Sequence, residues 1–347
     1  MLVLGAGASM PYGYMSGATL RQKLIDESTF RSLLEAKLMS STDVRGFCET
    51  FRYSGMSSID AFLSRRGRDL VPESTNTFEK IGKLGIALAL RQHATFGALF
   101  HRWIDASSDR IDKDDNWYEY LWARLTDGLP KSGIQSFGDN RLTVITFNYD
   151  TSLEQYLFTA LKNSYGLTDD VALDLLNKIP ILHVYGRLAF DQVDRIPNPL
   201  LYGVGGLGMA TKDAEQLRVM DENRLSDDAL RERCFRYFLE ADRIVFLGFS
   251  FDSVNINRLR VAEAIQTRYE RQFKTSGDRA PEIHCTTLGL EAYERDQAHS
   301  ALFDGIRRVS SEYVSRSEHY FEKSKANIVY TRDHKSLRLL RSSGALI

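Results

Sequence analysis

The first residues of the chain form a glycine-rich turn of the kind that binds phosphate. An apolar run, Leu2–Leu4, leads into the turn, whose five residues are Gly5, Ala6, Gly7, Ala8 and Ser9. Gly5 permits a sharp exit from a strand, Gly7 lets the backbone approach a pyrophosphate, and the N–H groups that open the following helix would face the anion. The third glycine of a dinucleotide-binding fingerprint is displaced, with Gly13 the nearest candidate, and no acidic residue follows at the usual distance. An ordinary glycine turn also fits these residues.

A second polar cluster, Asn148-Tyr149-Asp150, follows the apolar run Leu142–Phe147. Ligands of open α/β sheets bind at the carboxyl ends of strands, where this cluster is expected to lie. The amide of Asn148 both donates and accepts hydrogen bonds, which suits ribose hydroxyls or a positioned water. The alternative is structural, with Asn148 and Asp150 capping the helix that follows.

Two further segments place polar side chains within or after apolar strands. His183 lies in the run Ile181–Tyr185, where its imidazole could be a general base or a buried histidine with satisfied hydrogen bonds. Gly248 and Ser250 follow the run Arg243–Leu247, where a glycine turn and a hydroxyl suit a second phosphate or ribose. A serine cap at a strand–helix turn is the alternative there.

A parallel sheet would bring these residues together, and the chain has strand-like runs for one. The runs are short, apolar, and β-branched or aromatic, as buried parallel strands are. They are Leu2–Leu4, Leu142–Phe147, Ile181–Tyr185, Arg243–Leu247, Ile283–Leu288 and Asn327–Thr331. Segments of helical length lie between the later runs, at Ser152–Leu161, Ala229–Ala241 and Val254–Phe273. The alternation predicts an α/β fold with a Rossmann-like, mostly parallel sheet and helices on both faces.

The gap between the first strand and Leu142 is too long for one crossover and has helical periodicity. Apolar residues recur at spacings of three and four in Ala18–Asp26, Phe30–Met39, Ile59–Arg66, Phe78–Trp103 and Asp115–Thr126. We therefore expect residues 19–140 to form an inserted helical subdomain, and residues 1–18 and 141–347 to form the Rossmann-like domain. Clustered glycines and two prolines in residues 190–228 predict a long loop, either a surface connection or a lid over the site.

Composition narrows the class of protein. The 347 residues are 43% hydrophobic and 26% charged with a formal net charge of −1, so direct nucleic-acid binding is not expected. The cysteines Cys48, Cys234 and Cys285 form no CxxC pair, which predicts no metal site and no disulfide framework and fits a reducing, cytoplasmic compartment. The central apolar stretch Leu84–Leu90 is far shorter than the roughly 20 residues of a membrane helix, and no secretion leader precedes the first strand.

Taken in order, the motifs resemble one family. A GAGAS turn, a strand ending in TFNYD, a strand with HVYG and a strand ending in GFSF are similar to the sirtuin-like NAD-consuming domain, above all to its branch in bacterial anti-phage defence. The likeness covers essentially the whole chain and includes Ser58–Leu63, which is similar to a helical motif of that branch. The family's usual HG or HLHG is HVYG here. The sirtuin deacylases carry a four-cysteine zinc module, which three scattered cysteines cannot build.

The resemblance implies an activity and a set of site residues. It implies an NAD⁺ glycohydrolase that releases nicotinamide and ADP-ribose, with Asn148 at the nicotinamide ribose and His183 as the catalytic histidine. The residues that it places against NAD⁺ are Gly5, Ala6, Gly7, Ala8, Ser9, Tyr149, Asp150, Gly248 and Ser250. The enzyme would act as an effector of abortive infection by depleting NAD⁺. The alternatives are an NAD-dependent protein deacylase or ADP-ribosyltransferase, and a module that senses NAD or ADP-ribose without cleaving it.

Such an effector must be silent until infection, so the resemblance implies control by a homo-oligomer or by a partner protein such as a translocase-type ATPase. Aromatic side chains of the helical segment are expected to leave a surface for self-association. They are Phe96, Phe100, Trp103, Trp117, Tyr118 and Trp122.

Overall fold

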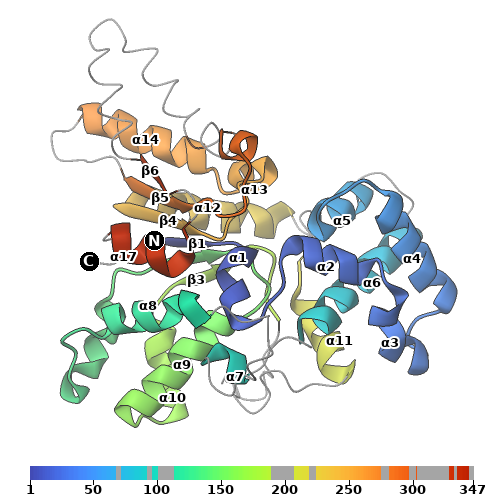
Figure 1. Ribbon diagram of the computed structural model, residues 1–347, viewed down its shortest axis with the longest axis horizontal. Helices are drawn as coiled ribbons and strands as arrows, with labels where there is room; N and C mark the ends of the chain where they lie inside the picture. Colours follow the sequence, from blue (N-terminus) through green and yellow to red (C-terminus); the bar gives the residue numbers. More distant parts are fainter. Residues whose placement is uncertain are drawn as a thin grey trace, which may run out of the picture.

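A parallel sheet forms the centre of the molecule, as a computed structural model shows (Figure 1). The structure describes residues 1–67, 72–91, 96–100, 113–188, 207–218, 224–274, 281–296, 302, 328–331 and 334–343. The strands of this part of the chain are β1 (Leu2–Leu4), β2 (Val144–Thr146), β3 (Ile181–His183), β4 (Arg243–Leu247), β5 (Glu282–Thr286) and β6 (Ile328–Thr331). Every pair of neighbouring strands is parallel.

The strand order is β3-β2-β1-β4-β5-β6, the order of doubly wound dinucleotide-binding sheets. The order reverses between β1 and β4, which makes the crevice at their carboxyl ends the topological switch point. Central residues of the sheet, including Val3, Ile145 and Phe246, have no exposed surface. The α/β fold class predicted from the sequence is confirmed.

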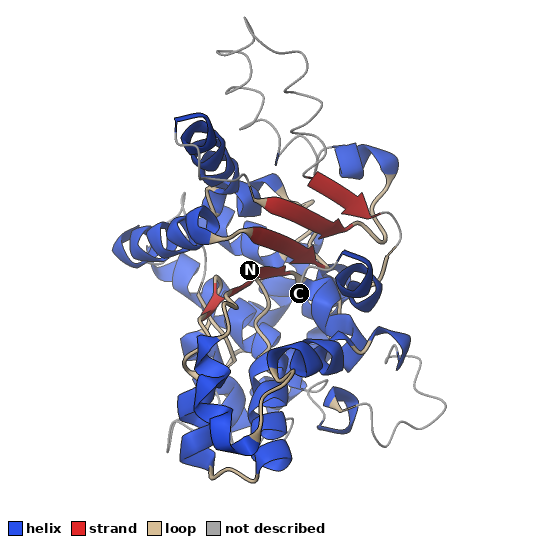
Figure 2. Cartoon of the chain, turned by 90° about the vertical axis from the view of Figure 1, so that its left-hand side faces the viewer, coloured by secondary structure: helices blue, strands red, loops and turns tan. Residues whose placement is uncertain are grey.

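Helices cover both faces of the sheet (Figure 2). On one face α8 packs against α9 and α17, and on the other α12 packs against α14. The helices of these layers are α8 (Trp117–Leu125), α9 (Ser152–Tyr165), α10 (Asp169–Leu176), α12 (Arg224–Glu240), α13 (Ser253–Arg258), α14 (Val261–Lys274) and α17 (Ser336–Ser343). The predicted helices at 152–161, 229–241 and 254–273 correspond to α9, α12 and the α13–α14 pair, while α10 was not predicted.

A separate group of helices follows the first strand, at the right of Figure 1. The chain reaches it through α1 (Ala6–Ser9) and η1 (Met10–Tyr12), and its elements are α2 (Gly17–Leu24), η2 (Glu27–Phe30), α3 (Arg31–Glu35), α4 (Ser41–Tyr53), α5 (Ile59–Gly67) and α6 (Pro72–Arg91). Its core is aromatic, because the Phe47 ring contacts those of Phe30, Phe51 and Phe62. Short helices α7 (Phe96–Leu99), η3 (Lys113–Asp115) and η4 (Lys131–Asp139) complete the described part of this region.

The prediction that this region is helical is confirmed, but the bounds of some helices differ and one helix was missed. Predicted helices near 18–26, 59–66 and 115–126 correspond to α2, α5 and α8. The helix predicted over Phe30–Met39 is shorter, since α3 ends at Glu35 and Lys37 has a φ of 55°. The helix predicted over Phe78–Trp103 becomes α6 and α7, with residues 92–95 and 101–112 outside the described part. Helix α4 was not predicted.

The long loop predicted over residues 190–228 is wrong in its second half. Residues Leu207–Gln216 form α11, and α12 begins at Arg224. Three of the clustered glycines precede this segment and Gly208 lies in its first turn, while Ala210, Asp213 and Ala214 bury a helical face within it. Residues 189–206 and 219–223 lie outside the described part, so the lid prediction is not tested there. No helix in the described part is long and apolar enough to cross a membrane.

Candidate functional site

Two glycine turns meet at the switch point between β1 and β4. The amide of Gly5 donates to the Leu247 carbonyl at 3.0 Å, and the amide of Gly7 donates to the Gly248 carbonyl at 3.0 Å. A Cβ on Gly5 would lie 2.4 Å from the Gly248 oxygen. Gly248 has a φ of +56°, and a Cβ there would lie 2.1 Å from the Ala8 nitrogen. These glycines are therefore required for the backbone-to-backbone contact itself, whatever ligand binds nearby.

The helix that opens after the turn is short. It comprises Ala6–Ser9, and the amide of Ala8 donates to the Gly5 carbonyl at 2.9 Å. Of the amides expected to face a pyrophosphate, those of Gly7 and Ala8 thus already donate to carbonyls of the protein.

Asn148 joins the end of β2 to the first glycine turn. Its Nδ2 donates to the Gly5 carbonyl and to Ser9 Oγ, both at 2.9 Å, and its backbone amide donates to Thr146 Oγ1 at 3.0 Å. The residue is 7% exposed. Its Oδ1 accepts no hydrogen bond from the described residues, so that oxygen can serve a ligand hydroxyl or water. The proposed helix-capping role of Asn148 is therefore not what its side chain does.

His183 lies in the same polar cluster. The strand register pairs Leu4 with Thr146 and Thr146 with His183, which puts these three side chains on one face of the sheet. His183 Nδ1 lies 2.9 Å from the Asn148 carbonyl oxygen, and Nε2 lies 2.7 Å from Glu154 Oε1. Its side chain is 5% exposed. A carbonyl only accepts, so Nδ1 carries a hydrogen in this arrangement, and an ionised Glu154 takes a second hydrogen bond from Nε2.

The pKa values of two buried carboxyl groups in this cluster, those of Asp150 and Glu154, are shifted in opposite directions. Burial raises the pKa of Asp150, although hydrogen bonds from Ser152 and Ser9 oppose the rise. Burial also acts to raise the pKa of Glu154, but the charge and hydrogen bond of His183, with Arg187, bring that pKa below its usual value. Glu154 is therefore the ionised partner in the cluster.

Asp150 ends a chain of hydroxyl groups. Its Oδ1 accepts hydrogen bonds from the backbone amide of Ser152, at 3.1 Å, and from Ser152 Oγ. Ser152 Oγ in turn lies 2.6 Å from the Tyr118 hydroxyl. The capping function considered for Asp150 is thus present in part: Thr151 is the N-cap residue, and Asp150, just before it, bonds the amide of Ser152, the first residue of α9. Asn148, Asp150, Glu154 and Ser9 line a cavity of about 10 Å³, close to the space that one water needs.

Tyr149 points from the site toward the helical group. Its hydroxyl donates to Asp60 Oδ1 in the first turn of α5. Asp60 belongs to the Ser58–Leu63 segment that supported the resemblance, so two motifs far apart in sequence touch here. A second link runs from the Tyr185 hydroxyl, after β3, to Asn255 Oδ1 on α13.

The structure brings most of the predicted site residues together. The residues that gather at the carboxyl ends of β1, β2, β3 and β4 are Gly5, Ala6, Gly7, Ala8, Ser9, Asn148, Asp150, His183 and Gly248. Tyr149 lies at the border with α5. Ser250 is exposed and lies beyond the Gly248 turn, away from the buried polar cluster.

Glu154 was missed by the sequence analysis. The spacing of Thr151 and Glu154 is that of a capping box, in which the acid bonds the backbone at the helix start. Thr151 makes no capping hydrogen bond, and Glu154 bonds His183 instead. The available signal was a glutamate in the first turn of the predicted helix that follows the polar cluster.

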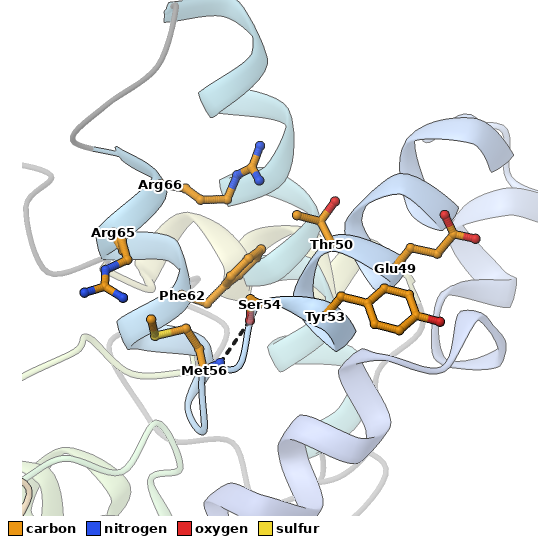
Figure 3. Close-up of a pocket in the computed structure, with 8 residues that line it drawn as sticks. All are labelled: Glu49, Thr50, Tyr53, Ser54, Met56, Phe62, Arg65 and Arg66. Carbon is orange, nitrogen blue, oxygen red and sulfur yellow. Dashed lines mark hydrogen bonds between the residues drawn. The ribbon is translucent and has the colours of Figure 1, made fainter.

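A larger cavity of about 460 Å³ lies in the helical group between α4 and α5 (Figure 3). Its lining residues include Phe62, Tyr53 and Arg66. The Arg66 guanidinium lies 4.3 Å from the Phe78 ring centroid. We place the candidate site at the strand ends rather than here, because the polar groups of four strands converge there. Asp60 connects the two places through α5.

The described residues contain no group of three or more histidine, cysteine, aspartate or glutamate side chains placed to hold a metal ion. The chain matches no protein-family model, no curated protein and no solved structure. The functional assignment therefore depends on the geometry of the site and on the motifs.

Proposed function

We propose that the protein is an NAD⁺ glycohydrolase that cleaves NAD⁺ to nicotinamide and ADP-ribose. The observation that carries the proposal is the cluster of Asn148, His183 and Ser9 at the switch point of a doubly wound sheet, where such sheets bind dinucleotides. The motif order that resembles sirtuin-like domains supports the same assignment.

The reaction suits the groups present. Nicotinamide leaves from a cationic glycosidic bond, so the protein needs to stabilise an oxocarbenium-like ribose and to deliver a nucleophile rather than to protonate the leaving group. The free Oδ1 of Asn148 would orient a ribose hydroxyl or the attacking water. His183 would accept the proton as general base. Water as the nucleophile yields ADP-ribose.

We further propose that the enzyme serves anti-phage defence by depleting NAD⁺, and that a homo-oligomer or a partner protein such as a translocase-type ATPase controls it. The aromatic residues expected at a self-association surface do not support this part. Trp117 and Tyr118 are buried, Phe100 stacks on Tyr156, and Trp122 packs near Phe137. The Phe96 side chain and Trp103 are outside the described part. Oligomerisation is thus proposed from the resemblance alone.

The test measures nicotinamide released from NAD⁺ by chromatography, with the purified chain and with bacterial cells that express it with its gene neighbours during phage infection. His183→Ala and Asn148→Ala should each lower turnover by about 10²-fold or more, the size expected for a general base or a positioned transition-state contact. Asp174→Asn, an exposed change on α10, is the matched control and should leave turnover unchanged. Circular dichroism checks that each variant is folded.

Retained turnover in both folded site variants would place the reaction elsewhere. No nicotinamide release in either setting would reject the hydrolase and favour a module that senses NAD or ADP-ribose. Acyl-ADP-ribose detected by mass spectrometry with an acylated peptide would instead favour a deacylase. Light scattering of the active preparation shows whether it is an oligomer.

A further inference from the structure

The buried carboxylate of Glu154, which contacts His183, has no role in the proposed reaction as described above. Glu154 is 7% exposed, lies in the first turn of α9, and places Oε1 2.7 Å from His183 Nε2. A buried carboxylate is costly unless a partner compensates its lost hydration. Its charged partners among the described residues are His183 and the more distant Arg187, which lies 3.8 Å away and whose side chain is 58% exposed.

We propose that Glu154 is the positioning residue of His183, and that Nδ1 is the ring nitrogen that acts on the substrate. The proposal rests on the proposed function, because it concerns how the same histidine works. Glu154 itself does not touch the substrate. It fixes the ring plane, keeps hydrogen on Nε2 and stabilises the imidazolium that forms during the reaction, as the carboxylate of a catalytic triad does.

The two hydrogen bonds of the His183 ring differ in strength, and therefore in how easily a ligand replaces them. The Nε2 bond to a carboxylate is charge-assisted and is about twice as strong as a bond between neutral groups. The Nδ1 bond is to the neutral carbonyl of Asn148, the residue whose side chain is expected to hold the ribose. A ribose hydroxyl or a water therefore displaces the Nδ1 contact and leaves the Nε2 contact in place.

The step balances without any further reagent. In the resting arrangement both ring nitrogens carry hydrogen. When a ribose hydroxyl or a water displaces the Asn148 carbonyl, Nδ1 first releases its hydrogen to solvent, which leaves a neutral ring with hydrogen on Nε2 and a lone pair on Nδ1. As water attacks the ribose carbon, its O–H bond breaks and the proton forms an N–H bond at Nδ1. The bond from the ribose carbon to nicotinamide breaks at the same time, and its electron pair leaves on the nicotinamide nitrogen. The imidazolium later releases its proton to solvent.

The charged and titratable groups that face the pair come from several elements. Glu154 is on α9, Arg187 follows β3, Asp150 follows β2, and Tyr118 is on α8. Asp150 makes its hydrogen bonds to Ser152, whereas Glu154 is the carboxylate that contacts the ring. Removing Glu154 therefore removes the principal anion beside His183.

The experiment compares wild type with Glu154→Gln, Glu154→Asp and the exposed control Asp174→Asn. Glutamine keeps the shape and can donate to a bare Nε2, so the fold should survive. Turnover of NAD⁺ by Glu154→Gln should fall by about 10- to 100-fold, the range for partners that orient a functional histidine, with little change in KM. Glu154→Asp should recover part of the loss, because the charge is retained.

Two readouts separate positioning from a merely structural effect. The acid limb of the pH–rate profile should move to lower pH in Glu154→Gln, because the protonated ring loses its stabilising anion. Nitrogen NMR of the histidine ring, recorded without NAD⁺, should show His183 releasing its second proton at lower pH in this variant than in wild type.

The outcomes distinguish the two proposals. A wild type that releases no nicotinamide but shows the NMR difference rejects the hydrolase and keeps the Glu154–His183 coupling. A wild type that is active while Glu154→Gln matches it in kcat, in the acid limb and in the NMR titration rejects the positioning role alone. A variant that loses activity with an unmoved acid limb and an unmoved NMR titration also rejects it.

Discussion

Single residues at the switch point have structural roles that are separate from any role in catalysis. Gly5, Gly7 and Gly248 allow two turns to approach at backbone distance. Asn148 then ties the first turn to β2, and His183 ties β3 to both Asn148 and α9. A substitution among these residues can therefore abolish activity by changing the fold, which makes stability measurements necessary alongside kinetics.

Replacing Gly248 by alanine should destabilise the protein strongly. The new Cβ would meet the Ala8 nitrogen at 2.1 Å, and the φ of +56° disfavours any side chain. We expect a loss of about 2–4 kcal/mol in the free energy of unfolding, measured by denaturant titration.

Gly46→Ala on α4 is the matched control. Its Cβ would meet no atom within 4 Å, and the position is inside a helix. It should stabilise the protein by about 0.5–1 kcal/mol. Equal effects of the two substitutions would contradict the close approach at the switch point.

At the scale of elements, α11 connects the helical group to the sheet. Arg91 at the end of α6 donates to Asp213 on α11 through two nitrogens, with the Nη2 bond at 2.9 Å. The Asp213 side chain is fully buried and that of Arg91 is 10% exposed. Directly after α11, the Arg218 amide donates to the Tyr185 carbonyl at 2.9 Å, next to β3. The helical group is thus coupled to the strand that carries His183.

Asp213→Ala should lower the free energy of unfolding by about 3–5 kcal/mol, because it removes the buried carboxylate that pairs with the Arg91 guanidinium. Asp127→Ala removes an exposed pair with Arg124 and should change stability by less than about 1 kcal/mol. Thermal and denaturant unfolding of the two variants checks the difference. Similar small losses would mean that the Arg91–Asp213 pair does not hold the two helices together.

The positions of helices and strands were predicted well from the sequence where a single local pattern of residues determines the element. Strands β1 and β2 are short buried runs, so their positions were readable, and β4 was predicted at its observed bounds. Helix α4 carries Val44, Phe47, Cys48 and Phe51 on one face behind a Ser40 cap, so its pattern was available but was not used. Helix α11 was hidden by neighbouring glycines.

Site residues were predictable to the extent that motif order implies a shared sheet edge. That reasoning brought Asn148, Asp150 and His183 to one place from separate segments. The contact of Glu154 with His183 depends on how α9 lies across the sheet, which no spacing within the chain reveals. The capping-box pattern even indicated a different partner for that carboxylate.

At the scale of the whole molecule, the three cysteines are buried and unpaired. Burial raises the pKa of Cys48 to about 11 and that of Cys234 to about 12, and it raises the pKa of Cys285 further. Thiolate is the reactive form, so none of the three should react quickly with a thiol reagent at about pH 8 in the folded protein.

In guanidinium all three thiols should react. Because the folded state holds them protonated, their contribution to stability is complete below the ordinary thiol pKa of 9.0 and is lost as pH rises toward the folded values. Stability measured against pH should therefore decline on the alkaline side. A thiol that reacts at once in the folded protein would contradict the burial described.

The place of β1 in the sheet also governs when the molecule can acquire its structure. Leu4 pairs with Thr146 on one side and with Leu247 on the other, so β1 is completed by two strands that leave the ribosome much later than it does. At synthesis rates of about 5–20 residues per second, β1 waits on the order of 10–50 s for β4. During that interval the β1 edge that pairs with β4 and the glycine turn lack their partner, and contacts so distant in sequence also close slowly. The switch point therefore cannot be completed before β4 has emerged, which delays the appearance of a competent site on a nascent chain until most of the polypeptide exists.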